Sequence, residues 1–196
     1  SDSDVRPVAV FQIAHGVSEH IDGYDNFARF LASQGVIVRG NAHIGHVLLF
    51  LLIGTILTTI LQSSSATMAL TIVLCSEGVI PLELAVALVL GENIGTTITA
   101  NIAAAIGNST AKRAARAHLL FNTIGVLWIL VVFRLVMPFI NFLTISIEGV
   151  SPYVSAAAVP VALSLFHTLF NIMNTSILVW FVPQIEKLTS LMVQGN

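Results

Sequence analysis

The most distinctive pattern in this chain is a short polar cluster inside a long apolar stretch. The cluster Gln62-Ser63-Ser64-Ser65 follows the apolar residues 47–53 and precedes the apolar residues 68–74. In hydrocarbon an unpaired polar group is costly, so such a cluster persists only where it lines a cavity or is packed in protein. The pattern therefore predicts a position where a solute binds, although serines also pack membrane helices as small residues.

Residues 43–75 predict a re-entrant helical hairpin with this cluster at its tip. The first arm, residues 45–61, is near the lower length limit for crossing ~30 Å of hydrocarbon, and the second, residues 66–74, is too short to cross. A single long helix with a polar centre is the alternative. The residues that follow, Ser76-Glu77-Gly78 and Pro81, predict a turn and the start of another helix.

The next apolar segment, residues 82–106, predicts a discontinuous transmembrane helix. It is interrupted by Gly91-Glu92-Asn93-Ile94-Gly95-Thr96-Thr97. Glycine weakens a helix interior, and Asn and Thr compete for backbone hydrogen bonds, so a local break is expected. The ends of half-helices offer N–H groups to anions and carbonyls to cations. Close packing through Gly91 and Gly95 is the alternative, but it does not explain Glu92 and Asn93.

Two further spans are predicted, at about residues 117–137 and 157–182. Basic residues gather in the connection before the first of them: Lys112, Arg113 and Arg116. By the positive-inside rule this connection lies in the cytoplasm. The C-terminal end, residues 184–196, then returns to the cytoplasm, and the hairpin opens on the outer side.

The two last spans share a pattern, His-x-Leu-Phe-Asn. It occurs as His118 with Asn122 and again as His167 with Asn171. Residues four apart share one helix face, so each pair could meet the hairpin tip or the expected break. A single histidine in a membrane helix is often only a packing residue, and the two asparagines are the stronger functional candidates.

Composition places the chain among integral membrane proteins. Of its 196 residues 56% are hydrophobic and 9% charged, with a mean hydropathy of +0.91, whereas a soluble domain carries roughly 25% charged residues. No basic patch indicates a nucleic-acid partner. The expected fold is an all-α membrane protein: a partly apolar, interfacial N-terminal segment (1–42), a membrane transport repeat (43–183) and a C-terminal end.

Enzymatic chemistry has little support in the sequence. The serines lack the Gly-x-Ser-x-Gly elbow of a serine hydrolase. Cys75 is the only cysteine, and the Glu and His residues are not spaced as transition-metal ligands. No glycine-rich phosphate loop follows a strand, because no strand pattern is evident. We expect no enzymatic activity and no cofactor other than a coupling ion.

Two motifs together resemble the sodium–phosphate cotransporter family. They are the Gln62–Ser65 cluster with Ala66-Thr67 and, near thirty residues on, the Gly91–Thr97 segment. The basic stretch that runs from Lys112 to Asn122 is similar as well. The likeness extends from about Leu48 to Pro183 and is strongest to bacterial members, which often carry a cytoplasmic tail related to the phosphate-uptake regulator PhoU.

The resemblance implies sodium-coupled transport of inorganic phosphate across a bacterial cytoplasmic membrane. The family has two inverted repeats, each with one Gln-Ser-Ser-Ser hairpin, and this chain resembles the second. Its partners would be phosphate, Na⁺, membrane lipid and a second repeat, from the same polypeptide or from another copy. Alternatives are a non-transporting sensor or assembly module of this fold, or a transporter of another small anion.

The resemblance also suggests roles for individual residues. Serine hydroxyls and half-helix N–H groups can hold phosphate without a fixed positive charge, and oxygen ligands suit sodium. Family members more often carry Ala where Glu92 stands, although Glu is compatible with this position in the second repeat. Its carboxyl group could hold a cation or pair with His or Arg. The phosphate candidates are Gln62, Ser63, Ser64 and Ser65; the sodium candidates are Thr67, Asn93, Thr96 and Thr97; the supporting residues are Glu92, Asn122 and Asn171.

Overall fold

The chain divides into two compact units, Ser1–His46 and Val47–Asn196. The structure is a computed structural model that describes residues 9–13, 36–40 and 44–193. The described part of the first unit contains two strands, β1 (Ala9–Ile13) and β2 (Val36–Gly40). They pair in parallel, with Ala9 opposite Val36.

These two strands correct the expectation that the chain has no strand pattern. Their sequences, AVFQI and VIVRG, are rich in the β-branched and aromatic residues that favour strands. A parallel pair needs a crossover of about a dozen residues or more, and residues 14–35 supply that length. The rest of the predicted interfacial segment, in residues 1–8, 14–35 and 41–42, lies outside the described residues.

The second unit confirms the all-α membrane class. Four helical segments of the described chain are long and apolar enough to cross a membrane: Ile44–Leu61, Leu82–Ala104, Ser109–Glu148 and Ala156–Met192. Large apolar side chains such as Val131, at 85% exposure, cover the outer surface, as expected for a protein that faces lipid.

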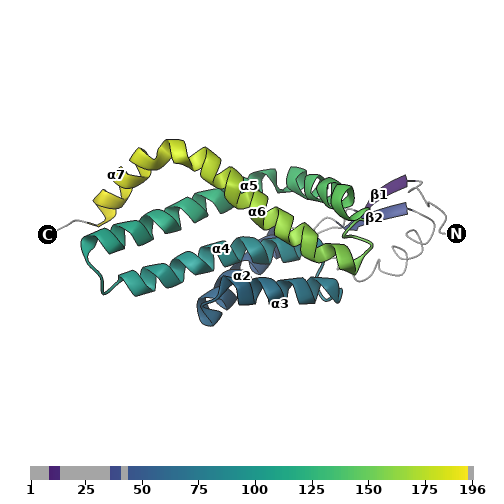
Figure 1. Cartoon of the computed structure of the whole chain (residues 1–196), viewed down its shortest axis with the longest axis horizontal. Coiled ribbons are helices and arrows are strands. Elements are labelled where there is room, and N and C mark those ends of the chain that lie inside the picture. Colours follow the sequence, from purple (N-terminus) through teal and green to yellow (C-terminus); the bar gives the residue numbers. More distant parts are fainter. Residues whose placement is uncertain (1–8, 14–35, 41–43, 194–196) are drawn as a thin grey trace. The chain divides into compact units, whose positions relative to one another are not determined.

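Helices α2 (Ile44–Leu61) and α3 (Ser64–Ser76) form the predicted helical hairpin. The chain reverses at Gln62, whose φ of +52° is in the left-handed region and ends α2. The arms touch near the tip, where the Thr58 hydroxyl donates to the Thr67 hydroxyl. Figure 1 shows α3 leaving this tip beside α4.

Helix α4 (Leu82–Ala104) is continuous, so the predicted break at Gly91–Thr97 is wrong. The polar side chains of this segment bond to carbonyls of their own helix and do not replace its backbone hydrogen bonds. Asn93 Nδ2 donates to Val89 O at 2.9 Å, and Thr96 Oγ1 to Glu92 O at 3.0 Å. Such bonds to the preceding turn leave the helix intact.

The two glycines of α4 serve close helix packing, the alternative weighed from the sequence. A Cβ added at Gly91 would collide with the carbonyl oxygen of Leu51, and one at Gly95 would lie 2.7 Å from the carbonyl oxygen of Thr55. The backbones of α2 and α4 therefore touch at these positions, as small residues permit in membrane helices. The Thr55 hydroxyl also donates to the Gly91 carbonyl at 3.1 Å.

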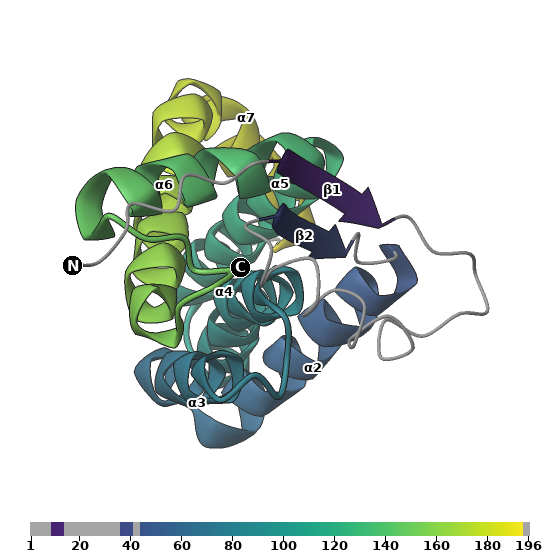
Figure 2. The ribbon, with the colours of Figure 1, turned by 90° about the vertical axis from the view of Figure 1, so that its right-hand side faces the viewer.

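Helix α5 (Ser109–Glu148) is much longer than the predicted span 117–137. Its 40 residues extend about 60 Å at 1.5 Å per residue. It starts at Asn108, whose side chain accepts from the Ala111 N–H at 2.9 Å, so the basic cluster lies on α5 and not in a loop. Pro138 removes one hydrogen bond inside the helix, and the green C-terminal part runs across the teal N-terminal part (Figure 2).

The predicted span 157–182 comprises three helical pieces. They are the short 3₁₀ turn η2 (Ala156–Ala158), helix α6 (Val159–Leu178) and the 3₁₀ turn η3 (Val179–Phe181). Helix α7 (Val182–Met192) follows and packs on α5. Arg113 Nε donates to the Val193 carbonyl at 3.1 Å, so the end of α7 lies at the end of the bundle where α5 begins.

Helix α4 forms the core of this unit. Residues 84–90 are all buried, and α4 contacts α3, α5 and α6. The hydrophobic half of α4 thus anchors the bundle, and its polar half, from Glu92 onward, lies where the hairpin tip, α5 and α6 converge.

Candidate functional site

The hairpin tip is an exposed group of hydrogen-bonding side chains at a helix N-terminus. Ser63 caps α3, because its Oγ accepts the Ala66 N–H at 3.2 Å, and it also lies 3.2 Å from Ser65 Oγ. Among the described residues no hydrogen bond reaches the backbone N–H of Ser64 or Ser65. Free N–H groups at a helix N-terminus attract anions.

A polar cavity of about 200 Å³ lies directly behind this tip. Ser64 contributes to it from α3, and the polar half of α4 forms a second wall. Because Ser64 shares this cavity with residues 92–96, the tip lies part-way along α4 and not at its end. The cavity is lined by Ser64, Glu92, Asn93, Thr96, His118, Phe121, Asn122, His167 and Asn171.

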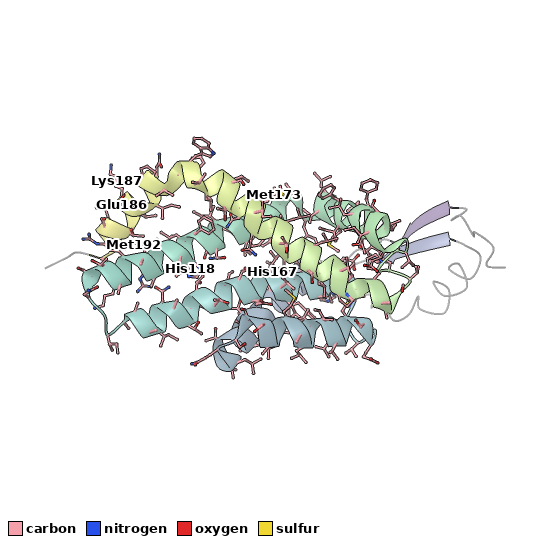
Figure 3. All side chains as sticks on the ribbon, in the orientation of Figure 1. His118, His167, Met173, Glu186, Lys187 and Met192 are labelled. Atoms are coloured by element: carbon pink, nitrogen blue, oxygen red, sulfur yellow. The ribbon has the colours of Figure 1, made fainter. Side chains whose placement is uncertain are left out.

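The repeated His-x-Leu-Phe-Asn pattern provides the other two walls. His118 and His167, labelled in Figure 3, line the cavity from α5 and α6. Asn122 Nδ2 donates to the His118 carbonyl at 3.0 Å, and Asn171 Nδ2 to the His167 carbonyl at 2.8 Å. Each amide group is therefore held by its own helix in the same way, and its carbonyl oxygen has no partner among the described residues.

Glu92 is the one acidic side chain in this lining. It is only 2% exposed, and within the described chain its Oε2 atom is buried with no hydrogen-bond partner. A buried carboxylate without a partner is strongly unfavourable, so the charged form of Glu92 requires a proton donor or a cation at this atom.

The side chains that line the cavity therefore offer several acceptor oxygens, while the Nδ2 groups of its asparagines donate to carbonyls of their own helices. Asn93 has the same arrangement as the other two asparagines, with Nδ2 bonded to its own helix. Three amide oxygens, a carboxylate and two hydroxyls line one small space. Oxygen donors of this kind suit hard cations. No group of three His, Cys, Asp or Glu side chains among the described residues is placed to hold a metal ion.

The predicted site residues separate into three groups. Ser64, Glu92, Asn93, Thr96, Asn122 and Asn171 line the cavity. Gln62, Ser63 and Ser65 belong to the tip and do not line it. Thr67 and Thr97 are fully buried, each at 0% exposure, and their hydroxyls donate to the Ser63 and Ile94 carbonyls.

Sequence reasoning missed Asn174, which is also fully buried at 0% exposure. Its Nδ2 donates to the Phe121 carbonyl at 3.2 Å, and its Oδ1 accepts from Trp128 Nε1 at 3.2 Å. Asn174 thus joins α6 to α5 beside the cavity and positions the backbone that carries Phe121. Its lack of any counterpart in α5 is why the repeated pattern did not reveal it.

The chain belongs to the Na⁺/Pi-cotransporter family, whose sequence model matches residues 41–151. This match contains the hairpin, α4 and the His118–Asn122 wall of the cavity. The predicted resemblance to sodium–phosphate cotransporters is therefore confirmed.

Individual relatives agree with this assignment. The chain is 36% identical over 146 residues to "Uncharacterized protein YqeW" of Bacillus subtilis (strain 168), covering 74% of this chain and 44% of that protein. It is 26% identical over 164 residues to "Putative inorganic phosphate export protein YjbB" of Escherichia coli (strain K12), covering 84% and 28%. It is 46% identical over 96 residues to "Sodium-dependent phosphate transport protein 2C" of Mus musculus, covering 46% and 16%.

The chain spans less than half the length of these relatives. No solved structure matches it significantly. The comparisons therefore establish the family, and the residues described above define what this part of such a protein contains.

Proposed function

We propose that this chain supplies one repeat of the substrate and ion site of a sodium-coupled transporter of inorganic phosphate. The observation that carries the proposal is the adjacency of two chemically different places: an exposed tip with free donors and an acceptor-rich cavity behind it. Ser64 belongs to both.

Phosphate would bind at the tip, through Gln62, Ser63, Ser64 and Ser65. The hydroxyls and the free N–H groups at the start of α3 can donate to phosphate oxygens, and the helix dipole favours an anion there. No Lys or Arg side chain lines the cavity beside the tip, so the anion would be held without a permanent positive charge and could leave.

Sodium would bind in the cavity. Its ligands would come from the carboxylate of Glu92, the hydroxyl of Thr96 and the amide oxygens of Asn93, Asn122 and Asn171. A sodium ion there would neutralise the buried carboxylate and place positive charge behind the phosphate. Thr67 and Thr97, also sodium candidates from the sequence, have hydroxyls engaged in packing contacts, and we assign them a supporting role.

The missing walls of the site would come from a second, inverted repeat. Alternating access requires one repeat to move against another, so a single copy would not transport alone. We place the whole protein in a bacterial cytoplasmic membrane, with the basic start of α5 and the C-terminal end of α7 on the cytoplasmic side. The Arg113–Val193 hydrogen bond supports a common side for both.

The test is uptake of labelled phosphate into proteoliposomes that contain the full-length parent protein. Uptake should require a sodium gradient and should fail in potassium or choline. Ser64→Ala with Ser65→Ala should lower uptake by about tenfold or more, because each lost donor to a charged group is worth about 1.5–3 kcal/mol. Ser176→Ala, which removes an exposed hydroxyl bonded to its own helix, is the matched control.

Two results would contradict the proposal. One is phosphate uptake that is equally fast without sodium. The other is unchanged uptake by the double serine variant while it remains folded. Competition by sulfate or arsenate at equal concentration would show whether the site prefers phosphate among oxyanions.

A further inference from the structure

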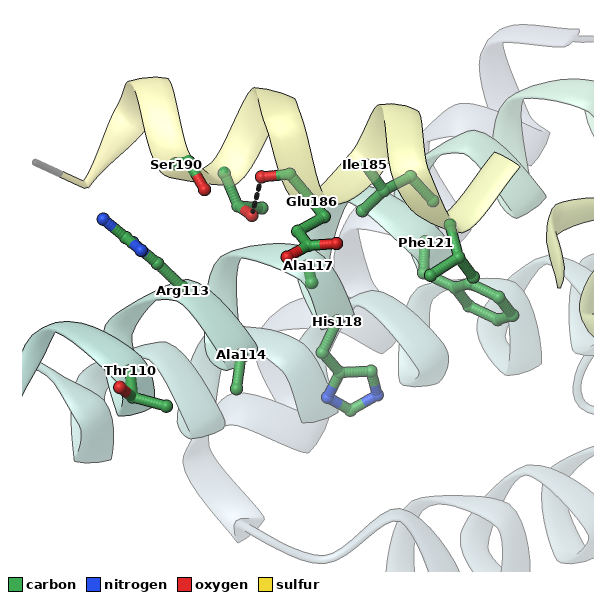
Figure 4. Close-up of a pocket in the computed structure, with 11 residues that line it drawn as sticks. Thr110, Arg113, Ala114, Ala117, His118, Phe121, Ile185, Glu186 and Ser190 are labelled. Carbon is green, nitrogen blue, oxygen red and sulfur yellow. Dashed lines mark hydrogen bonds between the residues drawn. The ribbon is translucent and has the colours of Figure 1, made fainter. Parts of the chain in front are cut away.

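A second and larger hollow, of about 510 Å³, lies between α5 and α7. Each helix contributes residues at three- and four-residue spacing, so one face of each forms a wall. Figure 4 shows Glu186 reaching from α7 toward α5, with Arg113 near the end of the hollow. The lining consists of Thr110, Arg113, Ala114, Ala117, His118, Phe121, Val182, Ile185, Glu186, Thr189 and Ser190.

This hollow and the polar cavity share two lining residues, His118 and Phe121. In Figure 4 the His118 ring points away from α7, and His118 shares the polar cavity with Glu92, Asn93 and Thr96 of α4. Only these two side chains of α5 therefore belong to both spaces. The small side chains of Ala114 and Ala117, one turn earlier, leave the room that makes the hollow.

One end of the hollow, lined by Thr110 and Arg113, lies where α5 begins. Arg113 lines this end and donates through Nε to the Val193 carbonyl just past α7. A guanidinium group has five N–H donors, so four remain. Charged and hydroxyl side chains, those of Arg113, Glu186, Thr189 and Ser190, line the hollow together with apolar ones, so its surface is partly polar.

Helix α7 is held by α5 and by the turn that precedes it. It packs mainly on α5, and the 3₁₀ turn η3 connects it to α6. A 3₁₀ segment between two helices is a common hinge. The Arg113–Val193 hydrogen bond holds the other end of α7 on α5, so the two ends of α7 are held by one 3₁₀ turn and one polar contact.

We propose that ions and water pass between the polar cavity and the Arg113 end of the molecule through this hollow, with His118 and Phe121 as its narrowest point. The inference rests on the proposed function, because it supplies the route by which the bound ion leaves on one side. Asn174 would act as a positioning residue, since it holds the Phe121 carbonyl.

Cysteine accessibility in the full-length parent protein tests the route. Cys75 is buried and is replaced by serine, together with any other cysteine of the parent. Ala117→Cys lies in the hollow, whereas Leu119→Cys lies on the same helix outside both linings and is the control. A membrane-impermeant cationic thiol reagent should modify Ala117→Cys about tenfold faster or more, because thiolates form in water, and only from the Arg113 side.

The narrowest point is tested with a reporter inside the cavity. Ser64→Cys should react faster from the Arg113 side when combined with Phe121→Ala, and more slowly with Phe121→Trp. The factor should be several-fold in each direction, because a pore constriction controls passage by its size. Phe121→Leu provides a conservative variant in case the alanine variant does not fold.

Equal reactivity of Ala117→Cys and Leu119→Cys would overturn the proposed route. So would a Ser64→Cys rate that does not depend on the side chain at position 121. Either result could occur while sodium-dependent phosphate uptake persists, which would leave the proposed function intact. Loss of sodium dependence with an unchanged labelling pattern would instead remove the proposed function.

Discussion

The Thr58 hydroxyl on α2 donates a hydrogen bond to the Thr67 hydroxyl on α3, with the two oxygens 3.0 Å apart. Thr67 in turn donates to the carbonyl of Ser63. Both threonines are buried, at 1% and 0% exposure. This relay ties the two arms of the hairpin together directly beneath the tip, so it fixes the position of the serines.

Removal of the Thr67 hydroxyl and removal of the Thr58 hydroxyl should lower the stability of the protein by different amounts. Thr67→Val leaves the Thr58 hydroxyl buried without an acceptor and should destabilise the protein by about 1–3 kcal/mol. Thr58→Val removes a donor only and should cost less. The double variant should cost less than the sum, because it leaves no unpaired donor. Unfolding in detergent measures all three, and strictly additive costs would contradict the relay.

The contact between α2 and α4 yields a second prediction. Gly95→Ala would place a Cβ 2.7 Å from both the Thr55 carbonyl oxygen and Thr58 Cβ, so the helices must separate. Overpacking of this kind costs about 1–3 kcal/mol and should move the hairpin tip. The melting temperature of the protein and its rate of phosphate uptake should both decrease. Gly107→Ala, where the nearest atom is 3.1 Å away in the side chain of Ala111, should change either much less.

Local patterns were sufficient to predict the hairpin and much of the cavity. The Gln62–Ser65 cluster cannot lie in lipid, and the four-residue spacing of His118 with Asn122 and of His167 with Asn171 fixes a common helix face. Ser64, Glu92, Asn122 and Asn171, which the sequence offers as candidates, all line this cavity. These features depend on neighbours in the sequence, which is why the sequence contains them.

Other features depend on what lies across an interface. The glycines of α4 suggested a break, but the backbone of α2, which meets them, is distant in sequence. The hydrogen bond between Thr58 and Thr67 could not be expected either, because nothing in the sequence places these two side chains together. Helix α5 continues through Pro138, where the composition suggested that the span had ended.

Asn174 should be among the most sensitive positions of the α5–α6 interface. Asn174→Ala removes the donor to the Phe121 carbonyl and leaves Trp128 Nε1 without its acceptor. We expect a loss of about 2–4 kcal/mol, as two hydrogen bonds of a buried amide are broken. Trp128→Phe breaks only one of them and should cost less. Chemical unfolding of the two variants measures the difference, and equal costs would contradict the bridging role.

If the proposed function is right, Glu92 should link the stability of the protein to the binding of sodium. Without sodium, the wild-type protein must bury a carboxylate oxygen that has no partner, whereas Glu92→Gln buries a neutral amide. The variant should therefore equal or exceed the wild type in stability in choline chloride. Sodium chloride should raise the melting temperature of the wild type, since a ligand that binds only the folded state stabilises it.

The Glu92→Gln variant should lose this increase in melting temperature. It should also need about tenfold more sodium for half-maximal phosphate uptake, which corresponds to about 1.4 kcal/mol. Glu77→Gln, at the exposed end of the hairpin, should retain the wild-type response. A sodium-dependent increase that persists in Glu92→Gln would show that the ion binds elsewhere.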